Sequence, residues 1–135
     1  MRVLIINGPN MQRLSKRGNQ YNASYEQLRD CIIDHAKSKN IEVEFFVTDI
    51  EGEIVQAIGR YDGDAIVINA AGYSHYSVAI RDALESFKGK KVEVHMTNVY
   101  AREEFRHHSI IAPVCDGVIC GFGLKSYLLA MDAAL

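Results

Sequence analysis

Short apolar runs alternate with amphipathic stretches along the chain, and this alternation constrains the fold more than any other feature. The apolar runs are short and rich in Val, Ile and Phe, so they predict strands: 3–7, 42–48, 65–69, 91–96 and 117–121. Between them, apolar side chains recur at helical spacing and predict helices: 24–39, 51–61, 77–87 and 125–134. The sequence therefore predicts a series of β-α-β units.

Units of this kind place their strands in a parallel sheet that helices cover on both faces. Five strands predict a flavodoxin-like α/β fold, a doubly wound five-stranded parallel sheet with helices on both faces. The 135 residues contain no linker and no repeat, so we expect a single domain over 1–135. In such sheets, ligands bind beyond the carboxyl ends of the strands.

Composition excludes several classes of protein. The net charge of -2 and the pI of about 6.2 argue against general nucleic-acid or anionic-membrane binding. No apolar run approaches the ~18 residues of a membrane span, and we expect a cytoplasmic location. Three cysteines without a C-x-x-C pair predict neither a disulfide framework nor a zinc site. No phosphate-binding glycine motif follows the first strand, which argues against a nucleotide cofactor.

Polar side chains follow three of the predicted strands. The first strand runs into Asn7 and Asn10, the third into Asn69 and His75, and the fourth ends at His95. A single Asn after a strand is an ordinary turn residue. Three strand ends of this kind at the same edge of the sheet instead indicate a site.

The connection 10–23 is long for an α/β protein and contains basic and phenolic side chains: Arg13, Lys16, Arg17 and Tyr21. Two interpretations remain open. It is either a solvated basic loop or a lid that brings a cation and a phenol over the site. The charged run 102–108 contains two adjacent histidines, which do not share a helix face, so no metal site is expected.

Six segments stand in the order and at nearly all the spacings of one known family: 7–10, 51–53, 69–84, 93–95, Asn98 and 102–109. Together they resemble type II 3-dehydroquinate dehydratase over essentially the whole chain. The resemblance implies a flavodoxin-like fold, in agreement with the strand and helix pattern. It also implies a cofactor-free enzyme of the shikimate pathway or of quinate catabolism. Such an enzyme eliminates water from 3-dehydroquinate through an enolate and gives 3-dehydroshikimate.

The resemblance further implies the catalytic roles. Tyr21 would remove a proton from the carbon beside the ketone, and Arg17 would lower the pKa of this tyrosine. Asn10 would hold a water that stabilises the enolate. His95 would be the general acid that protonates the departing hydroxyl, positioned with help from Asn69 and Glu93. Such a scheme requires no metal and no organic cofactor.

The same resemblance implies a set of residues that hold the substrate: Asn69, His75, Asp82, Met96, Thr97 and Arg106. The backbone amides of Met96 and Thr97 would bind the carboxylate, while His75 and Arg106 would hold hydroxyls. Asp82 would reach the site of a neighbouring subunit, because the family assembles as trimers packed into dodecamers.

The sequence departs from the family in three places. The lid segment 17–22 is one residue shorter and lacks the family's Glu and Pro, which makes Tyr25 the alternative to Tyr21 as the base. The turn 69–72 reads Asn-Ala-Ala-Gly where the family reads Asn-Pro-Gly-Ala. Ser126 stands where the family has a glycine.

Two other functions remain open on the sequence. One is a flavodoxin-like module that binds a flavin or nucleotide at the same edge, although Gly8-Pro9-Asn10 makes a poor phosphate loop. The other is a relative that keeps the oligomer but has a weakened or missing base. A spectrum of the purified protein and a dehydratase assay distinguish these alternatives.

Overall fold

The computed structural model describes residues 1–17 and 23–135. It contains an all-parallel five-stranded sheet of order β2-β1-β3-β4-β5. The strands are β1 (Arg2–Asn7), β2 (Glu42–Val47), β3 (Ala65–Asn69), β4 (Lys90–His95) and β5 (Gly117–Cys120). This strand order is the flavodoxin-like one, with a reversal of winding between β1 and β3. The predicted fold class is confirmed.

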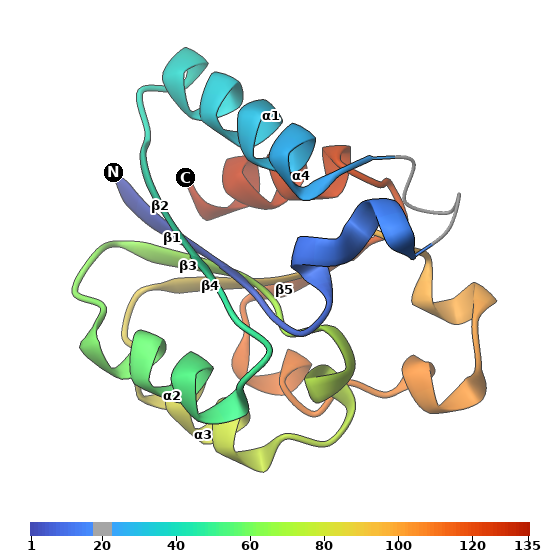
Figure 1. Ribbon diagram of the computed structural model, residues 1–135. Coiled ribbons are helices and arrows are strands. Elements are labelled where there is room, and N and C mark those ends of the chain that lie inside the picture. Colours follow the sequence, from blue (N-terminus) through green and yellow to red (C-terminus); the bar gives the residue numbers. More distant parts are fainter. Residues whose placement is uncertain (18–22) are drawn as a thin grey trace.

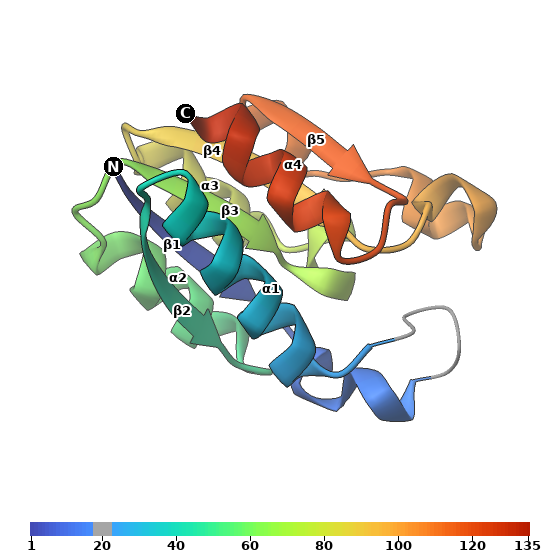
Figure 2. The same ribbon diagram turned by 90° about the horizontal axis from the view of Figure 1, so that it is seen from above.

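Two helices cover each face of the sheet (Figures 1 and 2). One pair is α1 (Tyr25–Ser38) and α4 (Lys125–Ala134), and the other is α2 (Glu51–Arg60) and α3 (Val78–Ser86). Side chains of a strand alternate between faces. In β1, Val3 and Ile5 therefore pack in the core beneath α1 and α4, whereas Leu4 and Ile6 pack beneath α2 and α3. Burial on both faces explains why this strand is continuously apolar.

Serine residues begin two of the helices. Ser24 forms the predicted capping box with Gln27 at the start of α1. At the start of α3, the Ser77 hydroxyl accepts a hydrogen bond from the Ile80 amide at 3.1 Å and donates one to Glu51 at 2.5 Å. Because Glu51 is the first residue of α2, Ser77 links the beginnings of the two helices.

The first connection is more ordered than the sequence suggested. We expected a long loop without secondary structure, but Met11–Lys16 forms a 3-10 helix. Met11 and Leu14 are almost completely buried in the core beneath α1 and α4. These two apolar side chains anchor the beginning of the connection to the domain core. The predicted base, Tyr21, lies outside the described residues.

The ladder brings the carboxyl ends of the central strands together. Asn7 of β1 is paired in register with Asn69 of β3, and Ile68 is paired with Glu93 of β4. Short 3-10 helices follow β3 and β4 at this edge: Ala71–His75, Val99–Ala101 and Glu104–His107. In the described parts of the chain, every helix is too short or too polar to cross a membrane.

Candidate active site

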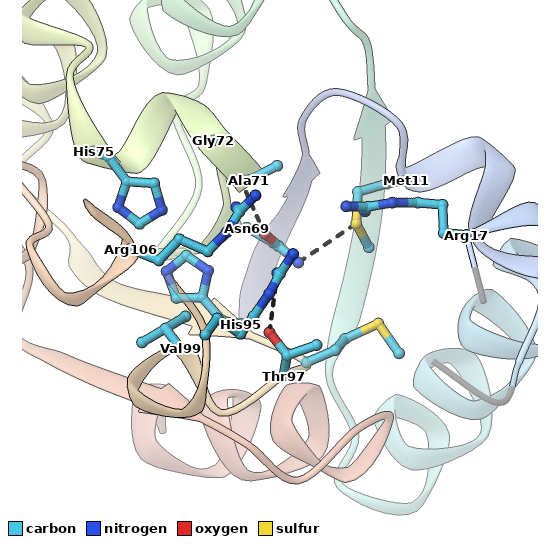
Figure 3. Close-up of a pocket in the computed structure, with 12 residues that line it drawn as sticks. Met11, Arg17, Asn69, Ala71, Gly72, His75, His95, Thr97, Val99 and Arg106 are labelled. Atoms are coloured by element: carbon cyan, nitrogen blue, oxygen red, sulfur yellow. Dashed lines mark hydrogen bonds between the residues drawn. The ribbon is translucent and has the colours of Figure 1, made fainter. Parts of the chain in front are cut away.

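A small open pocket lies at the carboxyl ends of β3 and β4 (Figure 3). Its walls come from the two strand ends, from the 3-10 helices that follow them and from the first connection. The lining residues are Met11, Arg17, Asn69, Ala71, Gly72, His75, His95, Met96, Thr97, Val99, Arg102 and Arg106. The fold therefore brings most of the predicted catalytic and binding residues into one pocket.

His95, at the end of β4, is held by a buried carboxylate. Its ring Nε2 lies 2.5 Å from Oε2 of Glu93, and Oε1 of Glu93 accepts a hydrogen bond from the Ser109 hydroxyl at 2.8 Å. Glu93 is completely buried and His95 is 7% exposed. An ionised carboxylate can only accept hydrogen bonds, so Nε2 carries the hydrogen on this side. The contact fixes the ring and leaves its other nitrogen, Nδ1, for a ligand.

His75 provides a second imidazole in the same pocket. Its Nδ1 lies 2.7 Å from the His108 carbonyl oxygen, which can only accept, so Nδ1 carries a hydrogen. The rings of His75 and His95 are nearly parallel, with centroids 6.4 Å apart. In Figure 3, Arg106 extends between His75 and His95. The pair offers proton donors and acceptors to a polar ligand of small size.

Arginine side chains give the pocket a positive character. Arg17, Arg102 and Arg106 all line it. Nε of Arg106 lies 3.1 Å from Oε1 of Glu103, and Arg102 donates to the Thr97 hydroxyl at 3.4 Å. The guanidinium group keeps its charge at every physiological pH. Although the whole chain is slightly acidic, this edge of the sheet suits an anionic ligand.

Two further features favour a carboxylate in the pocket. The Asn69 amide oxygen accepts a hydrogen bond from the Ala71 backbone at 3.0 Å, which turns its nitrogen away from that loop. In the described residues, the backbone N–H groups of Met96 and Thr97 have no hydrogen-bond acceptor. Backbone amides at a strand end can therefore bind a negatively charged oxygen.

Asn10 does not line the cavity but lies at the base of the first connection. It has a left-handed backbone, with φ of 71°, and its backbone N–H donates a hydrogen bond to Oδ1 of Asp49 at 2.9 Å. Arg13 donates to both Asn10 and Asp49, at 2.8 and 3.0 Å. The Asn10 hydrogen bond and the Arg13 guanidinium hold the pKa of the Asp49 carboxyl below its usual value. Arg13 thereby orients the Asn10 side chain, whose oxygen it occupies.

Tyr25, the alternative base, differs from what a base requires. It is the first residue of α1, and its hydroxyl is buried. Burial raises the pKa of Tyr25, despite the opposing influence of Arg29 and Asn7. A phenol that serves as a base needs the opposite shift. The structure therefore argues against Tyr25 as the base.

Asp82 lies on the exposed surface of α3 and does not line this cavity. Its predicted role depends on a second subunit. Several residues that do take part in the site were given no role by the sequence: Met11, Val99, Arg102 and Ser109. Ser109 is the most informative of these, because its bond to Glu93 spans 16 residues, and the segment 102–109 by itself does not indicate that partner.

The departures from the family's turn and helix have structural consequences. Ala71 occupies the position of the family's glycine and has a left-handed φ of 52°. Nearby, a Cβ on Gly8 would lie 2.9 Å from the Ala70 carbonyl oxygen, so only glycine fits between the two strand-end loops. Ser126 is completely buried, and its hydroxyl accepts a hydrogen bond from the Phe122 amide at 2.9 Å.

Metal ligands do not cluster in the parts of the chain that the structure describes. Within residues 1–17 and 23–135, no group of three or more His, Cys, Asp or Glu side chains could hold a metal ion. The polar groups of the pocket are suited to hydrogen bonding and proton transfer, with an imidazole, arginines, an amide and backbone N–H groups.

Comparisons with known proteins agree with this geometry. The model of the family "Dehydroquinase class II" matches residues 1–135. A 3-dehydroquinate dehydratase of Thermotoga petrophila is 50% identical over 134 residues, which cover 98% of this chain and 93% of that protein.

Solved structures show the same similarity in three dimensions. A type II dehydroquinase of Butyrivibrio crossotus has a TM-score of 0.96 and 49% identity, covering 99% of this chain and 97% of that one. A 3-dehydroquinate dehydratase-like protein of Bifidobacterium longum is more distant, with a TM-score of 0.75 and 31% identity over 99% of this chain and 94% of its own.

Proposed function

The chain belongs to the class II dehydroquinase family, and on this premise we propose that it dehydrates 3-dehydroquinate to 3-dehydroshikimate. The observation that supports this most is the contact between His95 and the buried Glu93 in a pocket with three arginines. A fixed imidazole can deliver a proton to a leaving hydroxyl. Arginines and backbone N–H groups suit a substrate that is a carboxylate and becomes an enolate.

The reaction needs a base, a stabilised enolate and an acid. Tyr21 removes the proton from the carbon beside the ketone, and the electron pair moves onto the ketone oxygen. Free tyrosine has a pKa of about 10, so its anion needs support from a cation. Arg17 lines the pocket, and its positive charge favours the phenolate form of Tyr21. Asn10 holds the water that hydrogen bonds to the enolate.

The enolate then collapses and expels the hydroxyl group. His95 gives its proton to the departing oxygen, which leaves as water, and a carbon–carbon double bond forms in conjugation with the ketone. Glu93 stabilises the charged ring before this step and fixes its direction. The amides of Met96 and Thr97 bind the carboxylate with Asn69, while His75 and Arg106 hold the substrate hydroxyls. No metal or organic cofactor takes part.

We infer that the active form is a dodecamer built from trimers, in the cytoplasm, with Asp82 contributing to a neighbour's site. Large apolar side chains are exposed around the site and suit burial between subunits: Tyr76, Val78, Tyr100, Phe105, Val118 and Phe122. Each is more than two-fifths exposed in the isolated chain. Light scattering at low micromolar concentration should give the mass of twelve chains. A monomer would contradict the assembly and the role of Asp82.

The proposed activity is tested by following the ultraviolet absorbance of the conjugated product. We expect purified protein to form it from 3-dehydroquinate at an undiminished rate in the presence of a chelator. His95→Ala should reduce turnover by about 10²–10⁴-fold and leave the circular dichroism spectrum unchanged. Activity that a chelator abolishes and zinc restores would refute the mechanism. A well-folded but inactive wild type would identify a relative that has lost the chemistry.

A further inference from the structure

A buried hydrogen-bond chain runs beneath the pocket, and its tyrosine has no part in the mechanism above. Tyr127, on α4, is completely buried. Its hydroxyl donates to Oδ1 of Asn7, and it accepts a hydrogen bond from Nδ2 of Asn69 at 2.9 Å. The three residues come from α4, β1 and β3, so the hydroxyl joins three separate elements at one point.

The direction of the bonds at Asn69 is determined. The Ala71 backbone N–H can only donate, so the Asn69 atom that it meets is the oxygen, and Nδ2 faces Tyr127. The hydroxyl hydrogen of Tyr127 is committed to Asn7, which leaves its lone pairs for Asn69. Burial raises the pKa of Tyr127 well above its ordinary value, so the hydroxyl keeps this hydrogen throughout the working pH range.

This arrangement accounts for one of the two hydrogens on Nδ2 of Asn69. The other has only the sulfur of Met11, at 3.6 Å, as a partner in the described residues. Sulfur is a weak acceptor, and both Met11 and Asn69 line the cavity (Figure 3). The amide therefore presents a weakly satisfied N–H to the ligand, beside the backbone amides of Met96 and Thr97.

We propose that Tyr127 is a positioning residue for substrate binding, whose hydroxyl locks the Asn69 amide so that an N–H faces the pocket. The inference rests on the proposed function, since it concerns the substrate of that reaction. Without the hydroxyl, the amide nitrogen loses its acceptor, and only the Ala71 N–H still holds the side chain against rotation. A rotated amide would present its oxygen to an anionic ligand and repel it.

The expected effect is on binding rather than on chemistry. Asn69 lies with the groups that hold the carboxylate, and this group keeps its charge throughout the reaction. An interaction that is equal in the ground state and the transition state changes KM and leaves kcat unchanged. We expect Tyr127→Phe to raise KM for 3-dehydroquinate about tenfold, equivalent to ~1.4 kcal/mol, with kcat within about threefold of wild type.

A double-mutant cycle with Asn69→Ala separates positioning from packing. If Tyr127 acts through Asn69, adding Tyr127→Phe to the Asn69→Ala protein should cause no further change in KM. Tyr61→Phe is the matched control, because it removes another buried hydroxyl near the opposite edge of the sheet. It should leave both kinetic constants unchanged.

The outcomes are distinct from those that test the proposed function. An inactive wild type refutes the function, whereas an active wild type with unchanged KM in Tyr127→Phe refutes the positioning role. Equal KM effects of Tyr127→Phe in both backgrounds would also overturn it, because they indicate packing. If Tyr127→Phe does not fold, Asn7→Ala removes the acceptor of the same hydroxyl. The hydroxyl hydrogen is then free to turn toward the Asn69 nitrogen, which should raise KM at constant kcat. An unchanged KM in Asn7→Ala would refute the proposal.

Discussion

Replacing Ala71 by glycine should stabilise the protein, although it removes a methyl group. Ala71 has a left-handed φ of 52°, which costs an L-residue with a Cβ about 1–2 kcal/mol. Glycine avoids this cost but loses more chain entropy on folding, about 0.5–1 kcal/mol relative to alanine. The difference predicts that Ala71→Gly raises the free energy of unfolding by about 0.5–1 kcal/mol. For a chain of this size, the midpoint of thermal unfolding should rise by roughly 2–3 °C.

Calorimetry at fixed protein concentration measures this shift, with Ala70→Gly as the control. Ala70 has an ordinary φ of -78° and a completely buried side chain. Its replacement loses chain entropy and one buried methyl group without relieving strain, so it should cost about 1–2 kcal/mol. Changes in the free energy of unfolding with opposite signs at these two adjacent positions would identify the backbone conformation of Ala71 as the cause of the stabilisation. A decrease in stability for Ala71→Gly, comparable to that of the control, would refute the reasoning.

Three other predictions concern the lid, the base of the first connection and α4. Tyr21→Phe should lose about 10²–10⁴-fold in turnover with substrate binding retained, whereas an inactive Tyr25→Phe would reverse the assignment of the base. Asp49 has a lowered pKa, so its stabilising effect is present above about pH 4 and is lost as the pH falls through its folded-state pKa. Asp49→Asn should therefore flatten the stability curve below about pH 4 in acid titrations, and an unchanged curve would exclude this role. Ser126→Gly should lower the free energy of unfolding in urea by about 1–2 kcal/mol, through the lost hydrogen bond and the entropy of glycine; no change would show the bond to be dispensable.

The fold was predictable because burial leaves a periodic trace in the sequence. Strands covered on both faces need consecutive apolar residues, and β1 and β3 show them directly. Helices covered on one face need apolar residues at helical spacing, and the capping box at Ser24 marked where α1 begins. The 3-10 helix Met11–Lys16 was missed, because two buried side chains are too few to establish a period.

The site was predictable only as far as strand ends could locate it. The parallel sheet brings the ends of β3 and β4 together, which explains why Asn69, His75 and His95 meet. The supporting contacts depend on tertiary structure instead. Ser109 reaches Glu93 from a separate loop, and Tyr127 reaches Asn69 across 58 residues from near the C-terminus. Neither partner can be read from the residue type or its immediate neighbours.

The strained turn at Ala71 and the buried hydrogen-bond chain through Tyr127 both orient the Asn69 side chain. Strain in a folded protein persists where the surrounding contacts require it. The Ala71 N–H is the donor that fixes the Asn69 oxygen, and Tyr127 fixes the nitrogen from the other side. The left-handed residue also redirects the chain into the 3-10 helix that carries His75 to its place beside His95. An alanine in a left-handed conformation costs stability, yet the turn that it completes orients both an amide and an imidazole into the pocket. Ala71→Gly should therefore stabilise the protein without changing KM, since glycine adopts the same turn with the same N–H.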